Sequence, residues 1–233
     1  MEDQKGREQE PADSLISKDN GIKYWESIDA DVNGMLGGFP HISRVDIRAS
    51  RNFLAKLRIG SKPGLHVVDS ALEGGAGIGR VTQGLLLDGI ADQVDVIEPI
   101  AKFTAGLREK PGVRRIFNMG LQDWQPAEGV QYDLVWIQWC AGHLTDEQLV
   151  QFLKRCKSVL RGDRVIVVKE NNSTAGEDQF DELDSSVTRE DATFRRVFGE
   201  AGLRLVQVEL QKGMQVGGCS LLPVRMYALK PAQ

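Results

Sequence analysis

Short apolar runs alternate with helical patterns from Leu65 to the end of the chain, and this alternation constrains the fold more than any other feature of the sequence. Strand patterns that alternate with helical ones are typical of βαβ units, whose strands form a parallel sheet. The run 165–168 is apolar at every position, as expected for a central strand that helices cover on both faces. We expect strands at 65–72 in part, 94–98, 113–118, 132–138 and 164–170, with helices at 79–87, 101–109 and 146–160.

The C-terminal part of the chain predicts two more strands that pair with each other. Apolar and polar residues alternate over 206–210, and a second run at 224–229 follows a glycine-rich connection. A helix expected at 189–201 precedes them. We therefore predict an α/β fold with a seven-stranded, mostly parallel sheet that ends in an antiparallel C-terminal strand pair.

Residues with capping side chains mark the ends of two of these helices. Thr145 and Gln148 have the spacing of a capping box in front of the helix at 146–160. Thr188 is a candidate N-cap of the last helix, and Gly202 is its expected stop.

The first 60 residues have a different character from the rest. Residues 1–20 contain few apolar side chains, so we expect them to form a flexible tail. Two helices are expected next, at 22–28 and 43–58. The predicted organisation is a single domain over 21–233, with a helical extension at 21–60 and a core at 61–233.

Composition and charge disfavour several classes of protein. The 29 basic and 33 acidic residues give a formal net charge of −4, which offers no broad surface for nucleic acid. No apolar run approaches the roughly 18 residues of a membrane span, and the N-terminus lacks the apolar stretch of a secretory signal. The three cysteines form no CxxC pair, so neither a disulfide framework nor a metal site is expected. These features favour a cytoplasmic protein with no membrane partner, and the nucleus stays open as an alternative.

A glycine-rich segment, EGGAGIGR at 73–80, follows the first expected strand and opens a helix. Glycines in this position let backbone N–H groups and a helix N-terminus approach a ligand closely. The spacing of Gly75, Gly77 and Gly79 differs from the dinucleotide fingerprint, which requires a glycine where Arg80 stands. This mismatch disfavours a nicotinamide cofactor. The alternative is a plain tight turn that packs a helix on a strand.

Two charged residues near the loop extend the argument to a ligand class. Glu98 ends the second expected strand, where an acidic side chain in such folds accepts hydrogen bonds from ribose hydroxyls. Arg80 could clamp a ligand carboxylate, although a local surface contact would also explain it. S-adenosylmethionine has both groups, so one ligand would account for both residues.

Three further segments are expected at the carboxyl ends of the strands, where open α/β sheets bind ligands. They are WIQWCAGH at 136–143, KENN at 169–172 and the acidic stretch EDQFDELDSS at 177–186. Each has a structural alternative: Trp139 as a core aromatic, His143 as a structural histidine, Asn171 as a turn residue, and the acidic stretch as a solvated loop.

Taken together, the motifs resemble the S-adenosylmethionine-dependent protein N-terminal (α-N) methyltransferases, which act on Xaa-Pro-Lys N-termini. The resemblance covers nearly everything after residue 20. It is carried by YW (24–25), GMLGG (34–38), GAGIGR (75–80), GLQD (120–123), WIQW (136–139), GHL (142–144), KEN (169–171) and DSSV (184–187).

The resemblance implies a Rossmann-like methyltransferase sheet, S-adenosylmethionine as cofactor, and roles for individual residues. The implied cofactor contacts are Gly75, Gly77, Arg80, Glu98, Leu121, Gln122, Gln138 and Trp25. The implied substrate contacts are Trp139 on the penultimate proline, Leu36 in the peptide pocket, and Asp181 and Ser186 on the third-position lysine. The implied catalytic residues are Asp184 and His143, which accept or orient the proton of the α-amine, and Asn171, which holds the first peptide carbonyl.

The chain departs from the family pattern at two places. Glu73-Gly74 stands where relatives read Asp-Cys, and Leu222 stands where they commonly carry tyrosine. By the same resemblance, the expected partners are protein N-terminal tails, with ribosomal proteins among them, and the expected state is a monomer.

Two other functions fit parts of the sequence. The cofactor half alone is compatible with methylation of a small molecule, and with a non-catalytic nucleotide-binding adaptor. The acidic segment distinguishes the first from a peptide methyltransferase, because it favours a cationic acceptor.

Overall fold

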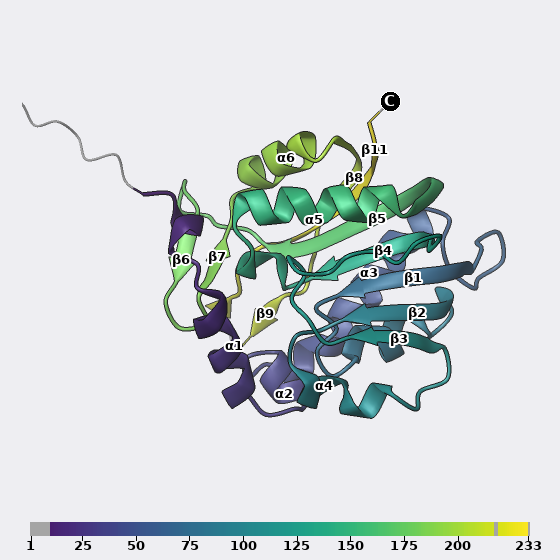
Figure 1. Ribbon diagram of the computed structural model, residues 1–233, viewed down its shortest axis with the longest axis horizontal. Coiled ribbons are helices and arrows are strands. Elements are labelled where there is room, and N and C mark those ends of the chain that lie inside the picture. Colours follow the sequence, from purple (N-terminus) through teal and green to yellow (C-terminus); the bar gives the residue numbers. More distant parts are fainter. Residues whose placement is uncertain (1–9, 217–218, 233) are drawn as a thin grey trace, which may run out of the picture.

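The computed structural model describes residues 10–216 and 219–232, and within them a seven-stranded sheet forms the centre of the molecule (Figure 1). The strand order is β3-β2-β1-β4-β5-β11-β8. The strands are β1 (Val68–Gly74), β2 (Ala91–Ile97), β3 (Val113–Phe117), β4 (Tyr132–Gln138), β5 (Leu160–Asn171), β8 (Leu203–Leu210) and β11 (Val224–Pro231).

Strands β1 to β5 pair in parallel, as the sequence predicts. The C-terminal strands pair antiparallel, which confirms that prediction, and β11 inserts between β5 and β8. The register pairs Gly74 with both Ile97 and Ile137, so the carboxyl ends of three strands lie side by side. This alignment brings the segments that follow them to one edge of the sheet.

Helices cover both faces of the sheet. One face packs against α5 (Asp146–Ser158) and α6 (Asp191–Glu200), and the other against α3 (Ser43–Lys56), which lies behind the sheet in Figure 1. The apolar run at 165–168 is buried on both sides: Ile166 and Val168 belong to the core under α5, and Val165 and Val167 to the core on the opposite face. No helix of the described residues is long and apolar enough to cross a bilayer.

Residues 10–20 differ from the expected flexible tail. They include a 3-10 turn, η1 (Ala12–Leu15), and the start of α1 (Lys18–Ser27). The backbone N–H of Ser17 donates to Oγ of Ser185 over 2.8 Å, and Asp13 accepts from the N–H of Asp146 over 2.8 Å. The prediction is wrong for this segment because hydrogen bonds to distant parts of the chain order it, although it buries little apolar surface. Residues 1–9 of the expected tail lie outside the described residues.

Several helix ends also differ from the sequence prediction. The capping box of Thr145 and Gln148 is confirmed. Thr188 does not cap a helix, because it ends a short strand and α6 begins at Asp191. The helix expected at 101–109 divides into α4 (Ala101–Thr104) and η4 (Ala105–Leu107), and the one expected at 79–87 contains a π-helical turn, η3 (Thr82–Leu86).

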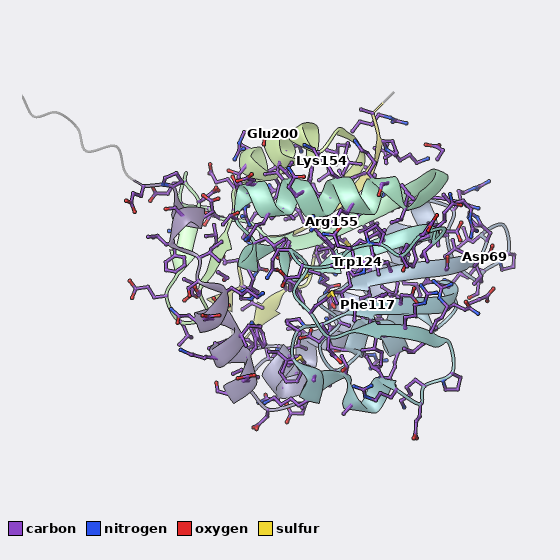
Figure 2. All side chains as sticks on the ribbon, viewed as in Figure 1. Asp69, Phe117, Trp124, Lys154, Arg155 and Glu200 are labelled. Carbon is purple, nitrogen blue, oxygen red and sulfur yellow. The ribbon has the colours of Figure 1, made fainter. Side chains whose placement is uncertain are left out.

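The remaining elements gather at the carboxyl end of the parallel strands, on the side of α1, β6 and β7 in Figure 1. They are α2 (Val32–Met35), η2 (Pro40–Ile42), η5 (Ala141–His143), β6 (Gln179–Asp181), β7 (Ser186–Thr188), β9 (Gln215–Val216) and β10 (Cys219–Ser220). Asp69, labelled in Figure 2, marks the opposite end of β1.

Candidate active site

The loop after β1 keeps its glycines because neither a side chain nor an ordinary backbone conformation fits there. Gly75 and Gly77 have φ angles of +69° and +53°, in the left-handed region that favours glycine. A Cβ at Gly75 would lie 2.5 Å from Cβ of Cys140, and one at Gly77 would lie 2.7 Å from Sδ of Met35. The loop therefore presents bare backbone to the space in front of it.

Glu98 follows β2 and lies against this loop. Its Oε2 accepts from the N–H of Gly77 over 2.8 Å, and its Oε1 accepts from the N–H of Ile100 over 2.9 Å. Burial raises the pKa of Glu98, and the two backbone hydrogen bonds oppose that effect. The carboxyl group is thus held at a defined place beside the glycine loop.

A cavity of about 150 Å³ opens in front of the glycine loop, and we call it the donor cavity. The backbone of the glycine loop, the carboxyl group of Glu98 and the guanidinium of Arg80 all line it. These groups fit the ribose and the carboxylate of S-adenosylmethionine. All the residues that the sequence predicts as cofactor contacts line it: Trp25, Gly75, Gly77, Arg80, Glu98, Leu121, Gln122 and Gln138.

Helix α5 supports the wall of the donor cavity at 121–122. Arg155 of α5 donates from Nη2 to the carbonyl oxygens of Leu121 and Gln122, each over 3.1 Å. Trp124 follows this turn and packs edge-on against Phe117, with ring centroids 6.4 Å apart (Figure 2). The position of residues 121–122 therefore depends on α5 and on an aromatic contact with β3.

Arg80 and Gln138 do not simply point at a ligand, because both bind a buried acid on α3. Nη1 of Arg80 lies 2.7 Å from Oδ2 of Asp46, and Nε2 of Gln138 lies 3.0 Å from both carboxylate oxygens. Lys169 also pairs with Asp46, and both of these side chains are fully buried. Burial alone would raise the pKa of Asp46, but the charges of Lys169 and Arg80 hold it below its ordinary value.

A second cavity of about 370 Å³, the acceptor cavity, lies beside the first. It is lined by most of the residues that the sequence predicts for substrate and catalysis: Leu36, Trp139, His143, Asn171, Asp184 and Ser186. Trp25, Met35, Trp139 and His143 line both cavities. The two cavities therefore meet at these four side chains.

Asp184 and Asp181 lie in different environments although both belong to the acidic segment. Oδ1 of Asp184 is buried and has no hydrogen-bond partner among the described residues. Asp181 is exposed, accepts from the N–H of Leu183 over 2.8 Å, and does not line either cavity. Both charges are near Tyr24: burial raises its pKa, and Asp184 and then Asp181 raise it further. Asp181 therefore lies outside both cavities, on the exposed part of the acidic segment.

Trp139 separates the two cavities in a conformation that is rare for a bulky residue. Its φ is +53°, and two cations lie near its ring: Cζ of Arg80 at 5.5 Å and Nζ of Lys169 at 5.9 Å from the ring centroid. Strained backbone of this kind persists only where the surroundings enforce it, and it clusters at functional sites.

His143 is held by Trp25 of α1. The indole N–H donates to Nε2 of His143 over 3.0 Å. Because an indole nitrogen can only donate, Nε2 carries the lone pair and the ring is neutral in this arrangement. Burial lowers the pKa of His143, and the nearby charge of Asp184 partly opposes that effect.

The turn that carries Trp139 and His143 depends on Glu170, which the sequence prediction placed in the KENN segment without giving it a role. Oε1 of Glu170 accepts from the N–H groups of Cys140 and Ala141, each over 2.8 Å. Burial raises the pKa of Glu170 to about 7, although these hydrogen bonds lower it.

The sequence prediction also left out Asp46 and gave Lys169 no role beyond its place in the KENN segment. A signal was present, since each is a charged residue within an apolar buried stripe: Asp46 shares a helix face with Phe53, and Lys169 continues the apolar run of β5. Opposite charges in two such stripes indicate a buried pair.

The departures from the family pattern occupy both cavities. Glu73 is fully buried in the wall of the donor cavity, and its Oε2 accepts from the hydroxyl of Thr82 over 2.5 Å. Leu222 lines the acceptor cavity and is 39% exposed.

The mostly parallel sheet, the glycine loop beside the donor cavity, and the adjoining acceptor cavity define an S-adenosylmethionine-dependent methyltransferase. Comparison with known proteins narrows this class. Residues 13–230 match the model of the AdoMet-dependent proline di-methyltransferase family, and the chain belongs to that family.

Individual relatives cover most of the chain. Alpha N-terminal protein methyltransferase 1 of Schizosaccharomyces pombe is 42% identical over 218 residues, which are 91% of this chain and 95% of the relative. The human N-terminal Xaa-Pro-Lys N-methyltransferase 1 is 45% identical over 197 residues, covering 82% of this chain and 86% of the human protein. A SAM-dependent methyltransferase structure from Leishmania major has a TM-score of 0.80 at 36% identity, over 91% of this chain and 82% of that one.

Proposed function

We propose that this chain transfers methyl groups from S-adenosylmethionine to the α-amino group of proteins that begin with Xaa-Pro-Lys. One observation carries the proposal: Asp184 lines the acceptor cavity, and its buried Oδ1 has no hydrogen-bond partner among the described residues. The similar proteins described above include N-terminal protein methyltransferases, and this similarity supports the same acceptor.

A carboxylate is a sufficient base for this acceptor. An α-amine has a pKa near 8, so deprotonating it at pH 7 costs about 1.4 kcal/mol, whereas a lysine side chain would cost roughly 4.6 kcal/mol. S-adenosylmethionine supplies an electrophilic methyl group on a sulfonium. Asp184 takes or orients the proton of the amine, and His143 holds Trp25 in place rather than acting as the first proton acceptor.

Alignment accounts for most of the proposed rate enhancement. Effective molarities of well-oriented groups correspond to as much as about 7 to 11 kcal/mol. Asn171 lines the acceptor cavity and holds the first peptide carbonyl, while the ring of Trp139 receives the proline. Ser186 and the exposed Asp181 are assigned to the third-position lysine, Asp181 from the rim.

Mass spectrometry of peptides incubated with the enzyme and S-adenosylmethionine tests the proposal. We expect added methyl groups on Xaa-Pro-Lys peptides with a free N-terminus and none on the same peptides after N-terminal acetylation. Methylation of the acetylated peptides would show that the methyl group is transferred to another nitrogen. Absence of turnover with every Xaa-Pro-Lys peptide, despite donor binding, would support the adaptor alternative.

We also propose that the substrates include ribosomal proteins and that the enzyme is a monomer of the cytoplasm. These assignments are supported by the sequence resemblance and composition alone. N-terminal proteomics of ribosomes from cells with and without the enzyme tests the first, and light scattering coupled to gel filtration tests the second.

A further inference from the structure

We propose that Asp46 is a positioning residue for donor binding: it holds Arg80 so that the free part of the guanidinium meets the carboxylate of S-adenosylmethionine. The inference rests on the proposed function, which assigns Arg80 to that carboxylate. Asp46 itself does not line the donor cavity, so it acts through Arg80.

The contacts of Asp46 are those of a central anchor. Its carboxylate is fully buried and receives Arg80, Gln138 and Lys169, which come from three different elements around the two cavities. Lys169 is tied further to α3 by a 2.8 Å hydrogen bond to Oγ of Ser50. A single acid on α3 thus fixes the side chains at the ends of β4 and β5 and at the start of the helix after the glycine loop.

The geometry of Arg80 leaves donors for a ligand. The hydrogen bonds of Arg80 within the described residues use Nη1 alone, to Asp46 and to Oγ of Ser43. A guanidinium has five N–H donors in a planar fork, so Nη2 and Nε remain for a carboxylate. Because Nη1 is held by Asp46, the orientation of the fork is set before the donor binds.

The charges around Arg80 explain why an anchor is needed. Glu73 and Glu98 line the same cavity, and the charge of Arg80 already lowers the pKa of Glu73 against the larger effect of burial. Without Asp46, Arg80 would be free to pair with one of these acids inside the cavity. That pairing would withdraw the guanidinium from the ligand carboxylate and would disturb the acid expected to bind the ribose.

Binding calorimetry with two donors tests this role. The probes are S-adenosylmethionine and its decarboxylated analogue, which lacks only the carboxylate that Arg80 is proposed to bind. In the wild type we expect the analogue to bind about tenfold or more weakly, the size of one charge-assisted hydrogen-bonding contact. In Asp46→Asn we expect that ratio of dissociation constants to fall below about threefold.

Two further variants separate positioning from loss of folding. Asp46→Asn/Lys169→Met removes one charge of each sign, so it avoids an unpaired buried lysine while still releasing Arg80. We expect it to unfold at a higher urea concentration than Asp46→Asn yet to show the same low ratio. Lys169→Met alone keeps the Asp46–Arg80 pair and should keep the wild-type ratio.

The outcomes distinguish this inference from the proposed function. A wild-type ratio in both Asp46 variants, together with a collapsed ratio in Arg80→Met, would overturn the role of Asp46 and leave that of Arg80 intact. An unchanged ratio in Arg80→Met would refute the carboxylate contact itself. Equal weakening of both donors in the Asp46 variants would show that Asp46 is merely structural.

Discussion

The indole N–H of Trp25 donates to Nε2 of His143 over 3.0 Å, and this hydrogen bond joins α1 to η5 where the donor and acceptor cavities meet. It occupies the lone pair through which His143 would otherwise accept a proton. Nδ1 is buried and has no partner among the described residues. Asp184 is therefore the better candidate for the group that receives the proton of the amine.

Trp25→Phe should raise the pKa of His143. In the wild type, protonation at Nε2 would break the hydrogen bond from Trp25, and this cost favours the neutral ring. Phenylalanine has no N–H to donate, so the cost disappears. The check is a pH titration followed by NMR of the imidazole nitrogens, in which His41 and His66 serve as references in the same spectra. An unchanged His143 titration would mean that the Trp25 hydrogen bond does not control this ring.

Asp184→Asn should lower kcat by about 10² to 10⁴, the usual contribution of a general base, and leave donor affinity nearly unchanged. Asn171→Lys should also nearly abolish transfer, because it brings a cation into the acceptor cavity. Single-turnover rates and donor calorimetry measure the two effects separately. Glu182→Gln, an exposed acid of the same segment, is the matched control and should behave like the wild type. Loss of donor binding in both active-site variants would contradict the assigned roles.

Asp181→Ala should raise KM for Xaa-Pro-Lys peptides by only about two- to fivefold, because an exposed ion pair contributes roughly 0.2 to 1 kcal/mol. The effect should be smaller for peptides with glutamine at the third position, and it should shrink at high salt. Peptide kinetics at two ionic strengths check both points, with Glu177→Ala as an exposed acidic control. An unchanged preference for lysine in Asp181→Ala would remove this residue from the substrate site.

Between pH 6 and pH 8, the free energy of unfolding should fall less in Glu73→Gln than in the wild type. Burial raises the pKa of Glu73 to about 8, against the opposing hydrogen bond from Thr82. The folded state therefore binds this proton more tightly than the unfolded state, and stability falls as the pH rises from about 4.5 toward 8.

The size of this effect is on the order of 2 kcal/mol between pH 6 and pH 8. Urea unfolding of the wild type and of Glu73→Gln at both pH values measures it. Glu170 titrates in the same direction but is present in both proteins, so the difference between them isolates Glu73. Parallel pH dependences of the two proteins would show that Glu73 is not protonated in the folded state near pH 7.

Gly77→Ala should weaken donor binding by about tenfold or more, because the new Cβ would lie 2.7 Å from Sδ of Met35 and would disturb the N–H that binds Glu98. The matched control is Gly176→Ala, which has a φ of +85° and no atom within 4 Å of the added Cβ. Both variants should lose about 1 to 2 kcal/mol of stability from backbone strain. Binding calorimetry should show weakened donor binding in Gly77→Ala and wild-type binding in Gly176→Ala. Equal donor affinities of the two variants would exclude a special role for the loop at Gly77.

Local patterns predicted much of this molecule because they act over a few residues. The capping box at Thr145 and the doubly buried strand at 165–168 depend on neighbouring side chains and on hydrophobic periodicity. The strand at 132–138 was predicted with the bounds that the structure has. The helix expected at 101–109 differs in the structure, because its second half tightens into a 3-10 turn.

In the candidate site, too, the features that depend on local sequence were predicted and those that depend on distant residues were not. Gly75, Gly77 and Glu98 were found from their order along the chain, because a strand, a glycine loop and a second strand bring them together in any βαβ unit. The order of residues 10–20 was not predicted, because it depends on hydrogen bonds to Ser185 and Asp146, far away in the sequence.

Periodicity, glycine spacing and motif content lie in short stretches of the chain, so the α/β architecture, the glycine loop and the family can be predicted without a structure. Three features depend on the folded arrangement: Asp46 pairs with Arg80 and Lys169, Trp25 donates to His143, and Oδ1 of Asp184 is buried without a hydrogen-bond partner among the described residues. These partners lie on separate elements. Their charges and hydrogen bonds are assigned only when folding excludes water and leaves each buried polar group the few neighbours it can reach.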